Sequence, residues 1–215
     1  MIYSRAKITW VFLFIVIFYL VSIHNIQSII NYNLTDFSHM EICQEVFLGS
    51  QRLSFNMSIF TIVLLMGFEH RYDNIYRFIR ANNNETIFTS IFMKGIFIAI
   101  FVALNAIAVQ LITLPIGNIA IDLQALFFTL VIILTYVYSV YSLYTLTYFI
   151  TFKHIVSLSA VVLYRMLLVL ILGSLNFSVL DFQPDVLFYI YIGLEIIVTN
   201  IIIVYLSNKK ERLVL

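Results

Sequence analysis

Six long apolar runs, separated by short polar segments, dominate this chain of 215 residues. A helix needs about 20 apolar residues to cross the hydrocarbon of a membrane, and the runs have roughly that length. Backbone polar groups in lipid must bond within their own segment, so the runs are expected to be helices. The predicted fold is therefore all-α, with a single membrane domain over residues 1–215. The expected spans are residues 8–30, 46–68, 87–114, 123–149, 155–175 and 186–206.

The scarcity of charge supports this interpretation. Charged residues make up 11% of the chain and hydrophobic residues 62%, whereas a soluble domain carries about 25% charged residues. So few charges cannot cover a surface that faces water, and lipid is the expected environment. No basic run interleaved with aromatic residues is present, so nucleic acid is not an expected partner.

The positions of lysine and arginine predict the orientation, because cytoplasmic loops carry an excess of both. With the amino terminus inside, nine of the twelve basic residues fall in cytoplasmic segments, and only Arg52 falls in an outer loop. We therefore expect both termini in the cytoplasm of a multi-pass protein in a bacterial plasma membrane. The nine are Arg5, Lys7, Arg71, Arg77, Arg80, Lys153, Lys209, Lys210 and Arg212.

The polar segment between the second and third runs is amphipathic. Tyr72, Ile75, Tyr76 and Ile79 recur at the spacing of one helix face. Such a helix either lies on the membrane surface or inserts into a groove on a partner protein. Its candidate contact residues are Glu69, Tyr72, Ile75, Tyr76, Arg77, Phe78 and Arg80.

This layout resembles the permease subunits of type-2 ABC exporters, the small six-span class of Gram-positive bacteria. It is most similar to permeases of lantibiotic-immunity and phenol-soluble-modulin export systems. The similarity lies in a second span that ends in Glu69, an amphipathic cytoplasmic helix, and a third span that opens with Lys94. Two features depart from the family pattern: Asn82–Asn84 stand where Gly and Pro are frequent, and the outer connection 176–185 is short.

The resemblance implies that the segment is a coupling helix, which docks on a cytoplasmic ATPase subunit present in two copies. It also implies a second permease, as a homodimer or a heterodimer, and amphipathic peptides or other lipophilic molecules as substrates.

The chain itself is not expected to be an enzyme or to hold a cofactor. A phosphate-binding loop needs two glycines five residues apart, followed by Lys and Ser or Thr. No two of the six glycines have that spacing, so ATP and magnesium would be bound by the partner. No metal site is expected either, because His39, Glu41 and Cys43 are an unconvincing set of mixed ligands.

Arg165 and Glu195 lie deep inside apolar runs, where charge is costly and usually faces the bundle interior. Arg165 and Glu195 are each about 12–15 Å from the expected end of their own helix, hence at similar depth. A short loop joins the two helices, which are therefore expected to be antiparallel neighbours. We predict that Arg165 and Glu195 pair, directly or through water, either as a structural link or as a gate or substrate contact.

Two further sets have alternative interpretations. Gly95, Ala99 and Ala103 form a stripe that permits close helix approach, within the chain or between subunits. Asn105 and Gln110 could hydrogen-bond across the same bundle. The tyrosines on one face of the fourth run are interfacial anchors or part of a substrate path: Tyr141, Tyr144 and Tyr148.

Other functions stay open from the sequence. A substrate-capture component of a vitamin importer has a similar size and span number. A membrane immunity or interaction protein without a transport cycle is a further alternative. An intramembrane enzyme would need paired carboxylates or histidines inside the spans, and only Glu195 is found there.

Overall fold

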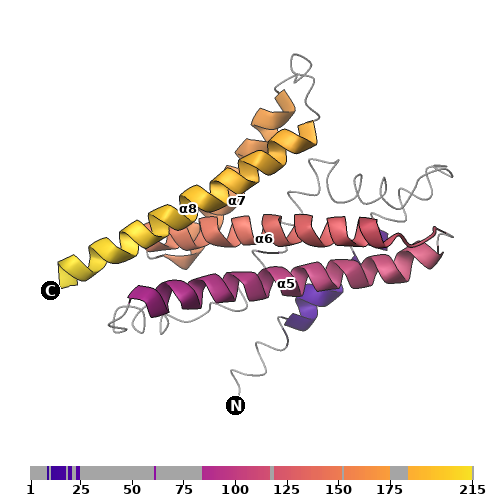
Figure 1. Cartoon of the computed structure of the whole chain (residues 1–215), viewed down its shortest axis with the longest axis horizontal. Helices are drawn as coiled ribbons and strands as arrows, with labels where there is room; N and C mark the ends of the chain where they lie inside the picture. The colour runs from indigo at the N-terminus through magenta and orange to yellow at the C-terminus, as the bar shows by residue number, and fades with distance from the viewer. Residues whose placement is uncertain are drawn as a thin grey trace.

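The computed structural model describes residues 9, 11–17, 19–20, 23–24, 61, 84–116, 119–151, 153–174 and 184–214. Within these ranges all regular secondary structure is α-helical and no strand occurs, which confirms the all-α expectation for this part of the chain. The long helices are α5 (Asn84–Ile116), α6 (Leu123–Thr151), α7 (His154–Ser174) and α8 (Pro184–Val214) (Figure 1).

The helices match the last four apolar runs closely, except at the end of α8. This helix continues to Val214, eight residues past the expected end of its run at residue 206. The apolar run stops at the first polar residues, but Lys, Glu, Arg and Leu are good helix formers. Hydropathy therefore marks where the apolar surface ends, and not where the helix ends.

Local side-chain chemistry sets several helix boundaries. Asp122 Oδ1 accepts a hydrogen bond from the backbone N–H of Gln124 at 2.9 Å, as an N-cap residue does. Pro184 opens α8, a position where its missing N–H costs nothing. Across the short link between α6 and α7, the hydroxyl of Thr151 at the end of α6 lies 2.9 Å from that of Ser157 in α7. This link brings α7 back alongside α6.

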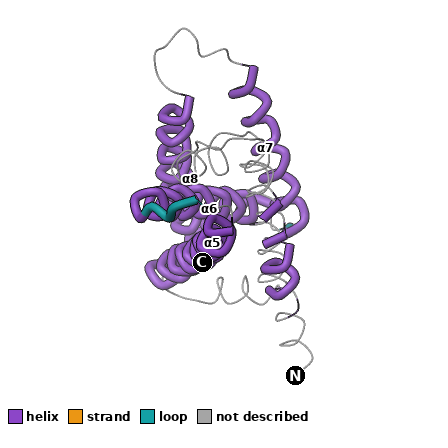
Figure 2. The backbone as a smooth tube through the Cα atoms, turned by 90° about the vertical axis from the view of Figure 1, so that its right-hand side faces the viewer, coloured by secondary structure: helices purple, strands orange, loops and turns teal. Residues whose placement is uncertain are grey.

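Helix α6 is the centre of the described bundle. It packs against α5, α7 and α8, whereas α7 and α8 have no comparably extensive contact with each other among the described residues. Figure 2 shows α7 and α8 leaving the α5–α6 pair on the same side, apart from one another. The two helices run in opposite directions, as expected (Figure 1), but α6 is the main packing partner of each.

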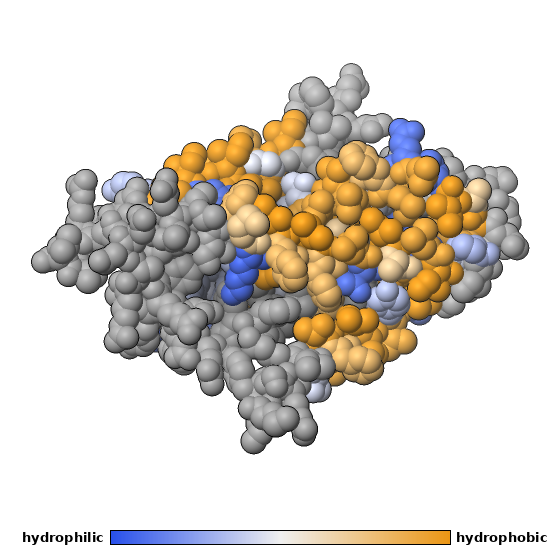
Figure 3. Space-filling model, turned by 60° about the horizontal axis from the view of Figure 1, so that its bottom comes forward, coloured by the Kyte–Doolittle hydropathy of each residue, from blue (hydrophilic) through white to orange (hydrophobic). Residues whose placement is uncertain are grey.

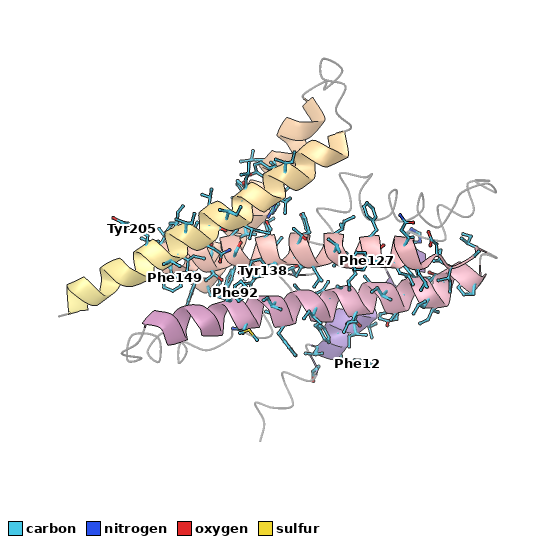
Figure 4. The ribbon with its side chains drawn as sticks, in the orientation of Figure 1. Phe12, Phe92, Phe127, Tyr138, Phe149 and Tyr205 are labelled. Carbon is cyan, nitrogen blue, oxygen red and sulfur yellow. The ribbon has the colours of Figure 1, made fainter. Side chains whose placement is uncertain are left out.

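The close contact between α5 and α6 depends on glycine, which has no side chain, at position 95. A Cβ placed on Gly95 would lie 2.5 Å from Tyr141 Cδ1 and 2.9 Å from Tyr138 Cε2. The tyrosine rings therefore fill the space that any larger residue would need. Phe92, one turn earlier on α5, meets the ring of Tyr138 edge-on at 5.7 Å between centroids (Figure 4).

The described part of the amino-terminal run also joins this core. Phe14 is fully buried and belongs to the main hydrophobic cluster. Its ring lies 6.0 Å from that of Phe101 on α5. Phe14 thus packs on the α5 side of the bundle.

Large apolar side chains cover much of the outer surface (Figure 3). Phe127 on α6 is 66% exposed and Tyr205 on α8 is 63% exposed, and both lie on the outside of the bundle (Figure 4). Such extensive exposed apolar area is unusual for a soluble monomer. On α5 the exposed apolar residues are Phe92, Met93, Phe97, Ile100, Leu104, Leu111 and Ile112.

Two helical stretches, Phe92–Pro115 and Leu123–Thr151, are long and apolar enough to cross a membrane. The apolar parts of α7 and α8 are shorter, over His154–Leu168 and Ile190–Leu206 of the described residues. The observed length and composition of α5 and α6 thus suit a membrane environment.

The packing at Gly95 generates a prediction with a matched control. Gly95→Ala should lower the free energy of unfolding by about 1–3 kcal/mol, because the new methyl group displaces buried tyrosine rings. Gly193→Ala should be neutral or stabilising by up to about 1 kcal/mol, because alanine favours helix and a Cβ there meets nothing within 4 Å. Unfolding of both variants in mild detergent measures the difference, and equal stability would contradict the tight α5–α6 contact.

Candidate functional site

The predicted ion pair between α7 and α8 is formed. Arg165 Nη2 donates to Glu195 Oε1 at 2.9 Å. The side chain of Arg165 is 1% exposed and that of Glu195 is 5% exposed, so both charges are withdrawn from solvent. Because burying either charge alone is costly, each side chain requires the other.

The pair is attached to α6 as well. Arg165 Nη2 also donates to the hydroxyl of Ser139, at 2.5 Å. The Arg165 guanidinium carbon lies 5.2 Å from the ring centroid of Tyr136 on α6 and 5.6 Å from that of Tyr164 on its own helix. Aromatic faces at this distance attract a cation. One arginine thus connects α6, α7 and α8.

The hydrogen bonding of the pair is incomplete within the part of the chain that the structure describes. Arg165 Nε, Arg165 Nη1 and Glu195 Oε2 are buried without a hydrogen-bond partner there. A guanidinium carries five N–H donors and a carboxylate can accept several bonds. A single bond between two such groups leaves most of this capacity unused.

Two further polar contacts connect α6 and α8 beside the pair. The hydroxyl oxygens of Thr199 and Ser142 lie 3.0 Å apart, and each hydroxyl also lies within hydrogen-bond distance of a carbonyl in its own helix. The Tyr138 hydroxyl donates to Asn200 Oδ1 at 3.2 Å. Ser142 and Thr199 are buried. We call the set of Tyr138, Ser139, Ser142, Arg165, Glu195, Thr199 and Asn200 the polar seam.

The stripe of small residues on α5 lies inside the protein. Ala99 is 2% exposed and Ala103 is fully buried, and Gly95 faces tyrosines of α6. These positions favour internal packing over a subunit interface. Gln110 Nε2 donates to Thr129 Oγ1 of α6 at 3.3 Å, as expected for a bond across the bundle. Asn105 instead bonds the carbonyl of Phe101 in its own helix.

The tyrosines of α6 are mainly packing residues. Tyr141 is 3% exposed and Tyr144 is 1% exposed. The Tyr144 hydroxyl lies 2.7 Å from His154 Nδ1, and its ring stacks on that of Tyr148 with centroids 5.9 Å apart. Rings that pack on one another, two of them buried and Tyr148 half-buried, favour a structural interpretation of this face over a substrate path.

The predicted coupling residues Glu69, Tyr72, Ile75, Tyr76, Arg77, Phe78 and Arg80 all lie outside the described residues, as does the weak metal set around Cys43. Among the residues that the structure does describe, no group of three or more His, Cys, Asp or Glu could hold a metal ion.

The sequence predicted that Arg165 and Glu195 pair, but not the polar residues of α6 and α8 that surround the pair. Ser139 and Ser142 are three residues apart on α6, and Glu195 and Thr199 are four apart on α8. Polar residues at these spacings share a helix face. In an apolar helix, this repeat was the signal that could have located the polar seam.

Comparisons with known proteins give no relative. No family model, no curated protein and no solved structure matches this chain. The polar seam is therefore assessed on its own geometry.

The ion pair predicts an asymmetric response to mutation. Glu195→Leu should lower the free energy of unfolding by about 3–5 kcal/mol, because it strands a buried arginine that cannot lose its proton. Arg165→Met should cost less, because a stranded carboxylic acid can take up a proton.

The double variant provides the control. Combining Arg165→Met with Glu195→Leu should restore most of the stability, because an apolar pair of similar volume replaces a buried ion pair with little loss. A double-mutant cycle measured by unfolding in mild detergent tests the coupling. Additive losses would show that the two side chains act independently.

Proposed function

We propose that the chain is a six-span protein of the plasma membrane, with both termini in the cytoplasm. The lengths of α5 and α6 support this proposal, as do the apolar side chains exposed on every long helix. The distribution of basic residues among the loops favours this orientation over the reverse.

Within that arrangement, we infer that the protein is the permease subunit of an ATP-driven exporter of amphipathic peptides or other lipophilic molecules. The observation that carries this inference is the basic amphipathic segment Glu69–Arg80. It combines an aromatic-aliphatic face with arginines, as a helix that docks in a groove does. The absence of a phosphate-binding loop from the sequence means that a separate subunit must hydrolyse ATP.

The fold suggests how force would travel from such a subunit. The segment ends at Arg80, and α5 begins at Asn84. A push on the segment would therefore act on the start of α5. Because Gly95 leaves no free space against Tyr141 and Tyr138, α5 and α6 would move together. In this proposal, α5 and α6 are the driven half of the permease.

Thiol labelling tests the orientation. Cys43, the one cysteine of the sequence, is expected outside and should react with a membrane-impermeant maleimide on intact cells. In a Cys43→Ser background, Asn83→Cys should react only after the cells are opened. Labelling of Asn83→Cys on intact cells would reverse the topology and exclude the coupling mechanism.

Co-purification tests the partner. An ATPase subunit encoded beside this gene should purify with the chain in mild detergent, and Tyr76→Asp should release it by placing a charge on the docking face. Asn74→Asp is the matched control, because it adds the same charge to the opposite side of the predicted helix. Retention of the ATPase by Tyr76→Asp, or absence of any ATPase from the wild-type complex, would favour a protein without a transport cycle.

A further inference from the structure

The two principal contacts of α6 differ in chemistry. Towards α5 it presents Tyr141 against Gly95, close to the buried Ala99 and Ala103. Towards α8 it presents Ser142 to Thr199 and Tyr138 to Asn200. Around Gly95, Ala99 and Ala103 the first contact depends on close apolar packing, with one side-chain hydrogen bond between Gln110 and Thr129. At the second contact, polar side chains meet beside the ion pair.

This difference determines what happens when water enters each contact. Separating α5 from α6 around Gly95, Ala99 and Ala103 would part closely packed apolar surfaces, which lose their contacts without replacement by water. Separating α8 from α6 would expose hydroxyl and amide groups, each of which can exchange its bond for one to water. The polar seam is therefore the contact of α6 that opens at lower cost.

The ion pair favours such opening. Leaving a buried donor or acceptor unsatisfied is destabilising, and three atoms of the pair lack a hydrogen-bond partner among the described residues. Neighbouring atoms cover all three, so a molecule reaches them only if the helices separate slightly. The closed arrangement is destabilised at the point where Arg165 and Glu195 meet.

The chemistry of the three atoms without a hydrogen-bond partner defines which molecule would bind at the pair. Arg165 Nε and Nη1 need an acceptor, and Glu195 Oε2 needs a donor. The pair is neutral as a unit, and adding a charged ligand at this depth would be costly. A small neutral molecule that both donates and accepts hydrogen bonds fits, and buried water typically makes about three such bonds.

We propose that the polar seam admits water and that the Arg165–Glu195 pair is the site where this water binds. The described structure is the closed form, in which α8 lies against α6. In the open form, water completes the hydrogen bonding of Arg165 and Glu195, and replaces the Thr199–Ser142 and Tyr138–Asn200 bonds. The inference is independent of the proposed export function, because it rests on α6, α7 and α8 alone.

Radiolytic hydroxyl-radical footprinting of the full chain in lipid nanodiscs tests the proposal, because ionised bound water oxidises the side chains beside it. Tyr136, whose ring faces Arg165, is the reporter. Tyr141 on the same helix is the control, since it is also buried, at 3% exposed against 7% for Tyr136, but packs against α5. Tyr136 should be oxidised about five-fold faster than Tyr141 if water binds at the pair.

A second arm removes the site. In the Arg165→Met, Glu195→Leu double variant, the rate at Tyr136 should fall to that at Tyr141, because an apolar site of this size stays dry. Equal rates at the two tyrosines in the wild-type chain would overturn the proposal without any variant. An unchanged excess at Tyr136 in the double variant would overturn the assignment of the water to this pair.

Discussion

A single buried ion pair determines how the carboxyl-terminal half of this protein is assembled. Arg165 and Glu195 come from different helices, and both are almost completely buried. Neither charge is tolerable in an apolar interior without the other, so α7 and α8 must occupy positions that bring the two side chains together. Ser139 supplies a third contact from α6. Helices α7 and α8 each pack on α6 more than on one another. This polar group therefore holds them in their relative positions, whereas apolar packing holds the other helices of the bundle together.

The bundle therefore combines two kinds of helix contact around α6. The contact with α5 is close and mainly apolar, since Gly95 accommodates the ring of Tyr141, and Gln110 and Thr129 add one hydrogen bond to it. The contact with α8 includes paired hydroxyls and an amide. Side-chain hydrogen bonds between helices in membranes contribute only about 0.6 kcal/mol on average. Such bonds favour one register of the two helices but are weak enough to be broken. The central helix α6 thus has a rigid contact with α5 and an exchangeable contact with α8. This combination suits a protein that must change shape, and a transport subunit would need both contacts.

Much of this arrangement could be predicted from the sequence, for physical reasons that also explain the failures. Arg165 and Glu195 were paired by counting residues from the helix ends, which works because helix rise is constant and burial of lone charges is prohibitive. Ser139 could not be assigned in this way, because serine in a helix commonly bonds its own backbone. Tyr141 suggested a substrate path, yet its role depends on Gly95, a residue far away in sequence. The apolar stretch of α8 ends at Leu206, but the helix continues to Val214, because charge ends an apolar surface and not a helix. The coupling segment Glu69–Arg80 lies outside the described residues and stays a prediction.

The spacing of the ion pair along the chain has a consequence for biosynthesis. Glu195 follows Arg165 by 30 residues, and ribosomes add about 5–20 residues per second. For a few seconds after Arg165 is added, the growing chain therefore contains an arginine whose counter-ion has not yet been made. Ser139 and Tyr136 precede it in the chain and are already available on α6. These two side chains can contact the guanidinium while the last helix is still in the ribosome. A hydroxyl and an aromatic ring are therefore available to Arg165 before the carboxylate of Glu195 is.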